Sequence, residues 1–310
     1  MTVRLLLGPQ RPRRYLGEAL TQSAIGEGSL AIIAAGWQEG EVDVSEVEEL
    51  VGRPLENLRL WQRAENVFEE RPSLRELYRE RQDRLVELQR LYRRRLKHVA
   101  IAARSMMRIK DENGLVADER QHAVDQVRAL DRHHLDRVEA IHRDYEGKIV
   151  EAGGNLLQRH ADEIRAELAR HRTLVITGGN VAILQNRMRL FGVHRMIREH
   201  ALLAWSAGAM ILSHRIVLYH DNTPEGRRDA EVFGAGFGLL PGFVFFPDTD
   251  QRLQTKRTRR VELLARRFAP DLCVSLNNGT VLEHDGKRVA RSVGLQRLRD
   301  DGVLEELEAA

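Results

Sequence analysis

Short apolar runs that end at glycine or proline alternate with amphipathic stretches in both end portions of the chain. The runs are typical of buried strands, which we predict at 3–7, 30–35, 58–61, 173–177, 201–205, 216–219 and 272–276, with two extended pieces within 237–246. Helical spacing predicts helices at 156–170, 181–191 and 257–268, and residues 280–293 indicate a hairpin turning at Asp285-Gly286. Strand, glycine turn and helix in repetition predict an α/β fold, a mostly parallel sheet with helices on both faces.

The pattern changes in the middle of the chain. Residues 73–110 contain no Gly or Pro, and apolar residues recur there at helical spacing over 38 residues, which is roughly 57 Å of helix. A second helical pattern runs from residue 116 to the Gly153-Gly154 pair. Together they predict a long antiparallel, coiled-coil-like helical hairpin that projects from the α/β body. We therefore expect an α/β domain of residues 1–66 and 155–310, with the hairpin inserted at 67–154.

The charges of the two arms are opposite. Residues 73–110 carry 12 Lys and Arg against 4 Asp and Glu, whereas residues 111–170 carry 9 against 14. The arms can neutralise each other, so we interpret the run Arg93-Arg94-Arg95 as solvated or paired within the hairpin. The net charge of the chain is only +3 and aromatic residues make up 5%, which makes a nucleic-acid partner improbable. The hairpin is instead expected to support self-association into a homo-oligomer or to bind a protein partner.

Composition excludes several classes of protein. With 310 residues, 42% of them hydrophobic, the chain is long enough for a full core. The single cysteine, Cys273, excludes a disulfide framework and a cysteine-based zinc site. No apolar run approaches 18 residues and the start lacks a signal-peptide pattern, so we expect a cytoplasmic protein without membrane contact. No dinucleotide loop or P-loop is present, and we expect neither a cofactor nor a metal.

The segment 201–210, ALLAWSAGAM, is the most informative stretch. An apolar strand that breaks at Ser206 and continues as a helix predicts a nucleophile elbow, which raises the serine side chain out of the sheet. Small residues suit such a sharp turn, and they stand at Ala204, Ala207, Gly208 and Ala209. The usual pattern has glycine two residues before and two after the nucleophile, and here Gly208 meets it while Ala204 does not. The alternative is an ordinary turn whose serine caps the helix.

A second turn, Gly178-Gly179-Asn180, follows the predicted strand at 173–177. It lies at the carboxyl edge of the sheet, where ligands bind in such folds and where the elbow also opens. We predict that the backbone amides of Gly179 and Ala207 form an oxyanion hole, and that Gly178 and Asn180 contact the substrate. The alternative is a tight strand-to-helix turn with no role in chemistry.

ITGGN followed by AWSAGAM resembles the serine-peptidase family of dipeptidase E and cyanophycinase, which has the class I glutamine amidotransferase-like fold. The resemblance covers roughly residues 1–65 and 170–290, and the hairpin looks like an insertion. It implies hydrolysis of a peptide or isopeptide-like amide in a peptide-like or amino-acid-derived small substrate. By position, Ser206 corresponds to the nucleophile, Gly179 to an oxyanion-hole residue, and Asp221 to the acidic triad member of dipeptidase E.

The chain departs from this family at the histidine. The stretch where the family carries its triad histidine is 245–250, FFPDTD, in which Asp248 is the candidate polar residue for substrate contact. An ionised aspartate is a weaker base than imidazole, with a pKa near 3.9 against about 6.5. We therefore name His220, beside Asp221, as the candidate base. Two alternatives stay open: a degenerate member that binds a ligand or a protein, and a glutamine amidotransferase subunit, disfavoured by serine where that class has cysteine.

Overall fold

The computed structural model describes residues 2–111, 114–221 and 229–309. Its strands are β1 (Arg4–Leu7), β2 (Leu30–Ile33), β3 (Leu55–Asn57), β4 (Thr173–Ile176), β5 (Ala201–Trp205), β6 (Arg215–Leu218), β7 (Glu231–Ala235), β8 (Phe243–Pro247), β9 (Leu272–Leu276), β10 (Val281–His284), β11 (Val289–Val293), β12 (Gln296–Leu298) and β13 (Leu304–Glu306). Its helices are α1 (Leu16–Thr21), the 3-10 helix η1 (Ala35–Val42), α2 (Ser45–Val51), α3 (Leu60–Glu70), α4 (Pro72–Met106), α5 (Leu115–Ala169), α6 (Val181–Leu190), α7 (Val193–Met196), α8 (Ala207–Leu212), α9 (Thr249–Arg252) and α10 (Thr258–Phe268).

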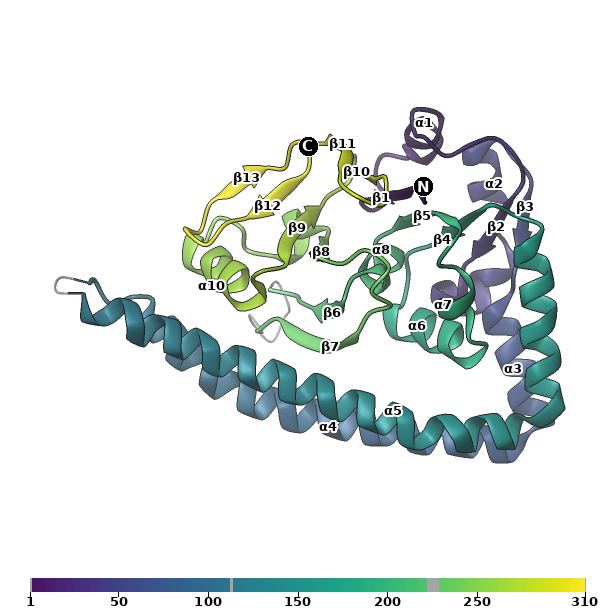
Figure 1. Cartoon of the computed structure of the whole chain (residues 1–310), viewed down its shortest axis with the longest axis horizontal. Helices are drawn as coiled ribbons and strands as arrows, with labels where there is room; N and C mark the ends of the chain where they lie inside the picture. Colours follow the sequence, from purple (N-terminus) through teal and green to yellow (C-terminus); the bar gives the residue numbers. More distant parts are fainter. Residues whose placement is uncertain (1, 112–113, 222–228, 310) are drawn as a thin grey trace.

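A seven-stranded sheet forms the centre of the molecule, in the order β11-β10-β1-β5-β4-β2-β3 (Figure 1). The strands β1, β5, β4, β2 and β3 are parallel, and β10 and β11 extend one edge antiparallel. A four-stranded sheet, β13-β12-β9-β8, and the hairpin β6-β7 lie beside it. The predicted mixed α/β fold with a large, parallel-rich sheet is thus confirmed.

Both faces of the central sheet are covered by helices. Neighbouring residues of a strand point to opposite sides of the sheet, so each strand contributes side chains to two cores. On one side Leu6 and Leu202 belong to a core that includes residues of α3, α5, α6 and α8. On the other side Leu5 and Leu203 belong to a core with α1 and α2. This two-sided burial explains why the strands are continuous apolar runs rather than alternating ones.

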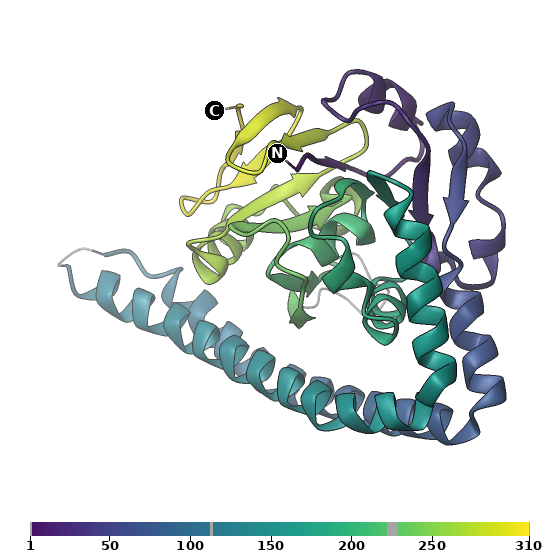
Figure 2. The same cartoon turned by 45° about the vertical axis from the view of Figure 1, so that its right-hand side comes forward.

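The two long helices form a bent antiparallel pair (Figures 1 and 2). α5 continues to Ala169, so the short helix predicted at 156–170 is its last part. The helix bends at Gly154, whose φ of 50° and ψ of −145° are not helical. Beyond the bend α5 runs beside α3, where Arg63 pairs with Glu167 at 2.7 Å.

The helical pair does not project from the body along its length, as we expected, but curves beneath β6, β7 and α10 (Figure 1). Tyr92 and Val127 of the pair belong to one hydrophobic cluster with Val232 of β7 and Phe268 of α10. The expectation was wrong because the apolar positions of each helix face both the partner helix and the body. A heptad-like pattern does not distinguish these two faces.

A buried polar cluster joins the pair to the body at the same place. Arg267 of α10 donates to the two carboxylate oxygens of Asp131 at 2.7 and 2.8 Å, and each side chain is only 3% exposed. Arg267 also donates to the hydroxyl of Tyr92 at 2.8 Å. His134 stacks on the Tyr92 ring and forms a hydrogen bond with Gln89 at 2.9 Å. These contacts fix the helices against the body.

Two of the predicted strands are not formed. Residues 58–61 do not form a strand; β3 precedes them, and α3 begins at Leu60 because Leu60, Ala64 and Val67 bury one helical face. The first extended piece expected within 237–246 is also wrong. There the amides of Phe237 and Leu240 donate to carbonyls at the end of α8 instead of to a neighbouring strand.

No helix within the described residues is both long enough and apolar enough to span a bilayer.

Candidate active site

Ser206 occupies a sharp turn between β5 and α8. Its φ of 49° and ψ of −116° lie in a region that residues with a side chain rarely adopt. Gly208 permits the tight packing of this turn, since a Cβ there would lie 2.3 Å from the carbonyl oxygen of Ile176. The Ser206 hydroxyl does not cap α8, so the helix-capping alternative is wrong. Strained backbone of this kind is found mostly at functional sites.

The Gly178-Gly179-Asn180 turn lies directly beside Ser206. A Cβ at Gly178 would be 3.1 Å from the Cβ of Ser206, so a larger residue would crowd the serine. Gly179 has a φ of +103° and passes close to Gly36, whose carbonyl oxygen would be 2.4 Å from an added Cβ. The side chain of Asn180 accepts from the amides of residues 182 and 183 and thereby caps α6. The turn is therefore held in place on both sides.

The amides of Gly179 and Ala207 are the predicted donors of the oxyanion hole. Within the part of the chain that the structure describes, neither donates a backbone hydrogen bond to another residue. Free amides at the start of a helix favour negative charge. Their role as an oxyanion hole for a substrate bound at Ser206 stays a prediction.

Asp248 and Asn277 lie at the same edge of the molecule as Ser206. The amide of Ser206 donates to the carbonyl of Leu7. The next residue, Gly8, packs against Asn277, and a Cβ added at Gly8 would be 1.8 Å from the Asn277 carbonyl oxygen. Asp248 donates its amide to the carbonyl of residue 276, next to Asn277. A chain of direct contacts thus links the elbow to Asp248.

The environment of Asp248 favours its protonated form. Burial raises the pKa of the Asp248 carboxyl above its ordinary value, and the nearby charge of Asp250 raises it further. Arg252, whose Nε is 3.6 Å from a carboxylate oxygen of Asp248, acts in the opposite direction. A carboxylate with a raised pKa is a better base than an ordinary aspartate.

Asp221 is buried, and its carboxylate is bound by an arginine. Arg260 donates to its two oxygens at 2.8 and 3.2 Å, and the amide of Gln254 donates to it at 3.0 Å. His220 is exposed. Among the described residues, no histidine forms a hydrogen bond with Ser206 or Asp221, so the predicted triad of Ser206, Asp221 and His220 is not joined by hydrogen bonds. The catalytic roles of Asp221 and His220 stay predictions.

Two features of the site were missed in the sequence. The first is the turn after β2, where Gly36 accepts a hydrogen bond from the Asn180 amide at 2.8 Å and supports the Gly-Gly turn. Its signal is an apolar run followed by Ala-Gly-Trp, the same strand-to-glycine pattern that marks residues 173–179. The second is the ion pair between Arg260 and Asp221, for which a single sequence holds no signal. Within the described residues, no group of three or more His, Cys, Asp and Glu side chains is arranged to hold a metal ion.

Comparison with known proteins identifies a matching protein family. The model of peptidase family S51 matches residues 131–292, a range that contains Ser206, the Gly-Gly turn, Asp221 and Asp248. No curated protein matches the chain. The solved structures similar to it include the crystal structure of a peptidase from an acI-B1 Actinobacterium, with 13% identity and a TM-score of 0.47, over 100% of this chain and 95% of that one.

Proposed function

The chain belongs to peptidase family S51, and from this membership and the geometry around Ser206 we propose a serine hydrolase that cleaves a peptide or isopeptide-like amide. The observation that carries the proposal is the backbone of Ser206, with a φ of 49° at the end of a buried parallel strand and beside Gly178. A strained serine at this point presents its hydroxyl to the edge where ligands bind. The substrate is peptide-like or derived from amino acids.

In the proposed reaction the Ser206 oxygen attacks the substrate carbonyl carbon while a base removes the hydroxyl proton. The carbonyl oxygen becomes an oxyanion, for which the amides of Gly179 and Ala207 supply donors. The intermediate collapses, the C–N bond breaks, and the amine leaves with the proton from the base. Water then hydrolyses the acyl-enzyme by the same steps and restores the serine. Gly178, Asn180 and Asp248 border the space for the substrate.

The proton acceptor is one of two groups. The first is His220, because an imidazole is by type a better base than a carboxylate, and its neighbour Asp221 falls by position on the acidic triad member of the resembling family. Asp248 lies in the stretch 245–250, which corresponds by position to the histidine-bearing segment of that family, and burial raises its pKa. Replacement of each by asparagine distinguishes them, because only the loss of the true base removes the acidic limb of the pH–rate profile.

We also propose that the α/β body has the class I glutamine amidotransferase-like fold, with the helical hairpin at 67–154 as an insertion. The parallel order β1-β5-β4-β2-β3 and the elbow after β5 support this assignment. The bend of α5 at Gly154 supports the proposed boundary at 154. The hairpin is proposed to serve self-association or a protein partner.

A second function has a specific observation in its favour. Because no described histidine forms a hydrogen bond with Ser206 and because Arg260 binds Asp221, the chain also fits a member of the family that has lost catalysis and binds a ligand or a protein instead. Loss of the triad removes most of the rate while it leaves the oxyanion hole and the binding site intact.

A fluorophosphonate probe decides between the two functions, because it reacts only with an activated serine. We expect the folded protein to be labelled and Ser206→Ala to lose the label, while Ser73→Ala, at an exposed position of α4, keeps it. Heat-denatured protein controls for unspecific reaction. A folded wild-type protein that takes no label would contradict the hydrolase and favour the ligand-binding alternative.

A further inference from the structure

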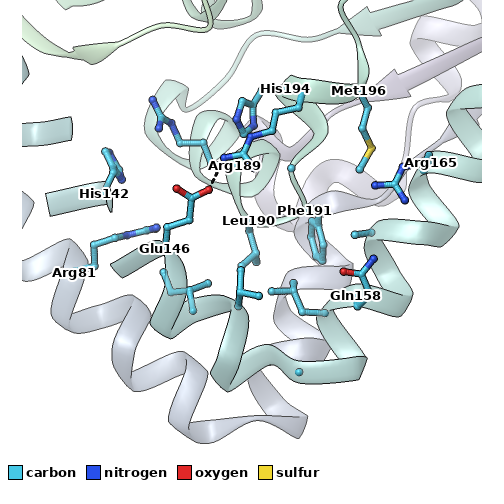
Figure 3. A pocket seen from close by; sticks show the side chains of 17 residues that line it. Arg81, His142, Glu146, Gln158, Arg165, Arg189, Leu190, Phe191, His194 and Met196 are labelled. Atoms are coloured by element: carbon cyan, nitrogen blue, oxygen red, sulfur yellow. Dashed lines mark hydrogen bonds and ion pairs between the residues drawn. The ribbon is translucent and has the colours of Figure 1, made fainter. Parts of the chain in front are cut away.

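A cavity of about 570 Å³ lies between the bend of the long helices and the segment from α6 to α7 (Figure 3). α6 begins at Val181, next to the Gly-Gly turn beside Ser206, and ends at Leu190, which lines this cavity. The cavity and Ser206 are therefore at opposite ends of the same helix. Its volume is in the range of small-molecule sites, roughly 300–1,000 Å³.

The walls of the cavity carry more arginines than carboxylates. The charged and imidazole side chains among the lining residues are four arginines, two histidines and one glutamate: Arg81, Arg165, Arg189, Arg195, His142, His194 and Glu146. In Figure 3, Arg81 and His142 lie on one side of the cavity and Arg165 on the other. An excess of positive charge in a partly enclosed space attracts anions, and the contribution of each arginine depends on whether it already has a carboxylate partner.

Three of the arginines have carboxylate partners of their own. Arg195 pairs with Glu146, Arg165 with Asp162 at 2.5 Å, and Arg189 with Glu139 at 3.1 Å. These pairs neutralise part of the charge around the cavity, so they do not by themselves require a ligand. The fourth arginine is different.

Arg81 is buried, only 5% exposed, and no carboxylate among the described residues lies within ion-pair distance of it. Its Nη2 is 3.5 Å from the side-chain oxygen of Asn186, and its guanidinium lies over the ring of Tyr78, 4.1 Å from the centroid. Within the part of the chain that the structure describes, its Nε has no hydrogen-bond partner. A buried charge is costly unless an opposite charge compensates it.

A second donor along the same wall is also unsatisfied: among the described residues, the buried Nε of Arg189 has no hydrogen-bond partner. The buried Nδ1 of His194 has none there either, and it can donate or accept depending on the tautomer. Burial and the neighbouring arginines lower the pKa of His142 to about 3, and burial with Arg189 lowers that of His194 to about 4. Both imidazoles are neutral at physiological pH, which leaves each with one N–H to donate.

We propose that this cavity binds a small molecule through its phosphate group, with the buried guanidinium of Arg81 as the counter-ion. A guanidinium offers a planar set of donors that matches phosphate oxygens, and several donors on different walls suit a tetrahedral, doubly charged anion. The apolar side chains of Leu157, Phe191 and Met196 line the rest of the cavity and provide contact for the organic part of the ligand. The site is separate from Ser206 and does not depend on hydrolase activity.

Isothermal titration calorimetry of the full chain with inorganic phosphate and with pyrophosphate, at constant ionic strength, tests the proposal. We expect both probes to bind, and Arg81→Gln to weaken binding by roughly tenfold or more, since it removes a charge-assisted hydrogen bond. Arg79→Gln is the matched control, because it removes an exposed arginine from the same helix outside the cavity. This variant is expected to bind as the wild type does.

A second variant covers the case in which Arg81→Gln does not fold. Arg165 lines the cavity but is 60% exposed, so Arg165→Glu leaves the interior unchanged and is expected to weaken binding of both probes. The proposal is overturned if neither phosphate nor pyrophosphate binds the wild type, or if both variants bind them as tightly as the wild type. Succinate that binds more tightly than phosphate would also overturn it, since the site would then select carboxylates.

Discussion

Arg260 holds the carboxylate of Asp221 in the interior through two hydrogen bonds. The Nη2 of Arg260 is 2.8 Å from one carboxylate oxygen and its Nε is 3.2 Å from the other, and the side chains are 2% and 0% exposed. The pair joins α10 to the segment after β6. A carboxylate in such a position stabilises the fold whether or not it also has a part in catalysis.

Replacement of Asp221 by asparagine is therefore expected to lower the free energy of unfolding by about 3–5 kcal/mol, because it breaks a buried ion pair. Chemical denaturation measures this change. Asp250→Asn is the control, since Asp250 is exposed and its removal should change stability by no more than about 0.5 kcal/mol. A variant of Asp221 that keeps full stability and loses fluorophosphonate labelling would show instead that the residue acts in catalysis alone.

The strained backbone of Ser206 gives a second prediction. With a φ of 49°, a serine or alanine at this position adopts a conformation that glycine adopts without strain. Ser206→Gly is expected to be more stable than Ser206→Ala by about 1–2 kcal/mol. Both variants lose the hydroxyl, so neither takes the fluorophosphonate label. Equal stability of the two variants in chemical denaturation would show that the turn relaxes and that the conformation is not strained.

A third prediction concerns acid stability. Burial lowers the pKa of His134 to about 4, although Asp131 opposes the shift. In the unfolded chain a histidine has a pKa near 6.5. Because the folded pKa is the lower one, the unfolded state binds more protons between these values, and stability falls as the pH falls. From pH 7 to pH 5 the loss due to His134 is about 2 kcal/mol.

Denaturation of His134→Gln at both pH values checks this prediction, since the variant should lose less stability on acidification by about that amount. His133→Gln is the matched control, because His133 is the preceding residue and is exposed. It should keep most of the acid sensitivity of the wild type, because the charge of His133 makes only the smallest contribution to the lowered pKa of His134. If His134→Gln is as acid-sensitive as the wild type, another group is responsible.

The sequence was most informative where one local rule decides the outcome. Apolar runs bounded by glycine predicted the strands of the central sheet, because a strand that is buried on both faces needs apolar residues at nearly every position. The strand-to-helix break at Ser206 was visible for the same reason: small residues are required wherever a strand turns sharply, and Gly208 meets that need. The long helices followed from the absence of Gly and Pro between residues 73 and 110.

The sequence did not indicate which side chains far apart along the chain form ion pairs. The ion pairs of Arg260 with Asp221 and of Arg267 with Asp131 join residues that are 39 and 136 positions apart, and charge patterning along the chain does not indicate which charges meet. The docking of the helical pair was missed for a similar reason, since an apolar stripe shows that a surface is buried but not what covers it. The sequence did not identify the base of the proposed reaction for the same reason, since the base is defined by which side chain lies near Ser206 in the fold.

The shared core predicts that the hairpin cannot be removed without harm. Deletion of residues 73–150, with a short Gly/Ser bridge, would expose Val232 and Phe268 and leave Arg267 without Asp131. We expect the shortened protein to bind a hydrophobic dye, to lose its near-ultraviolet circular dichroism and to unfold without a cooperative transition, as loosely packed states do. Asp131→Asn keeps the hairpin and removes only the ion pair, so it should still unfold cooperatively with lower stability. Cooperative unfolding of the deletion variant at the wild-type temperature would show that the α/β body folds independently of the hairpin.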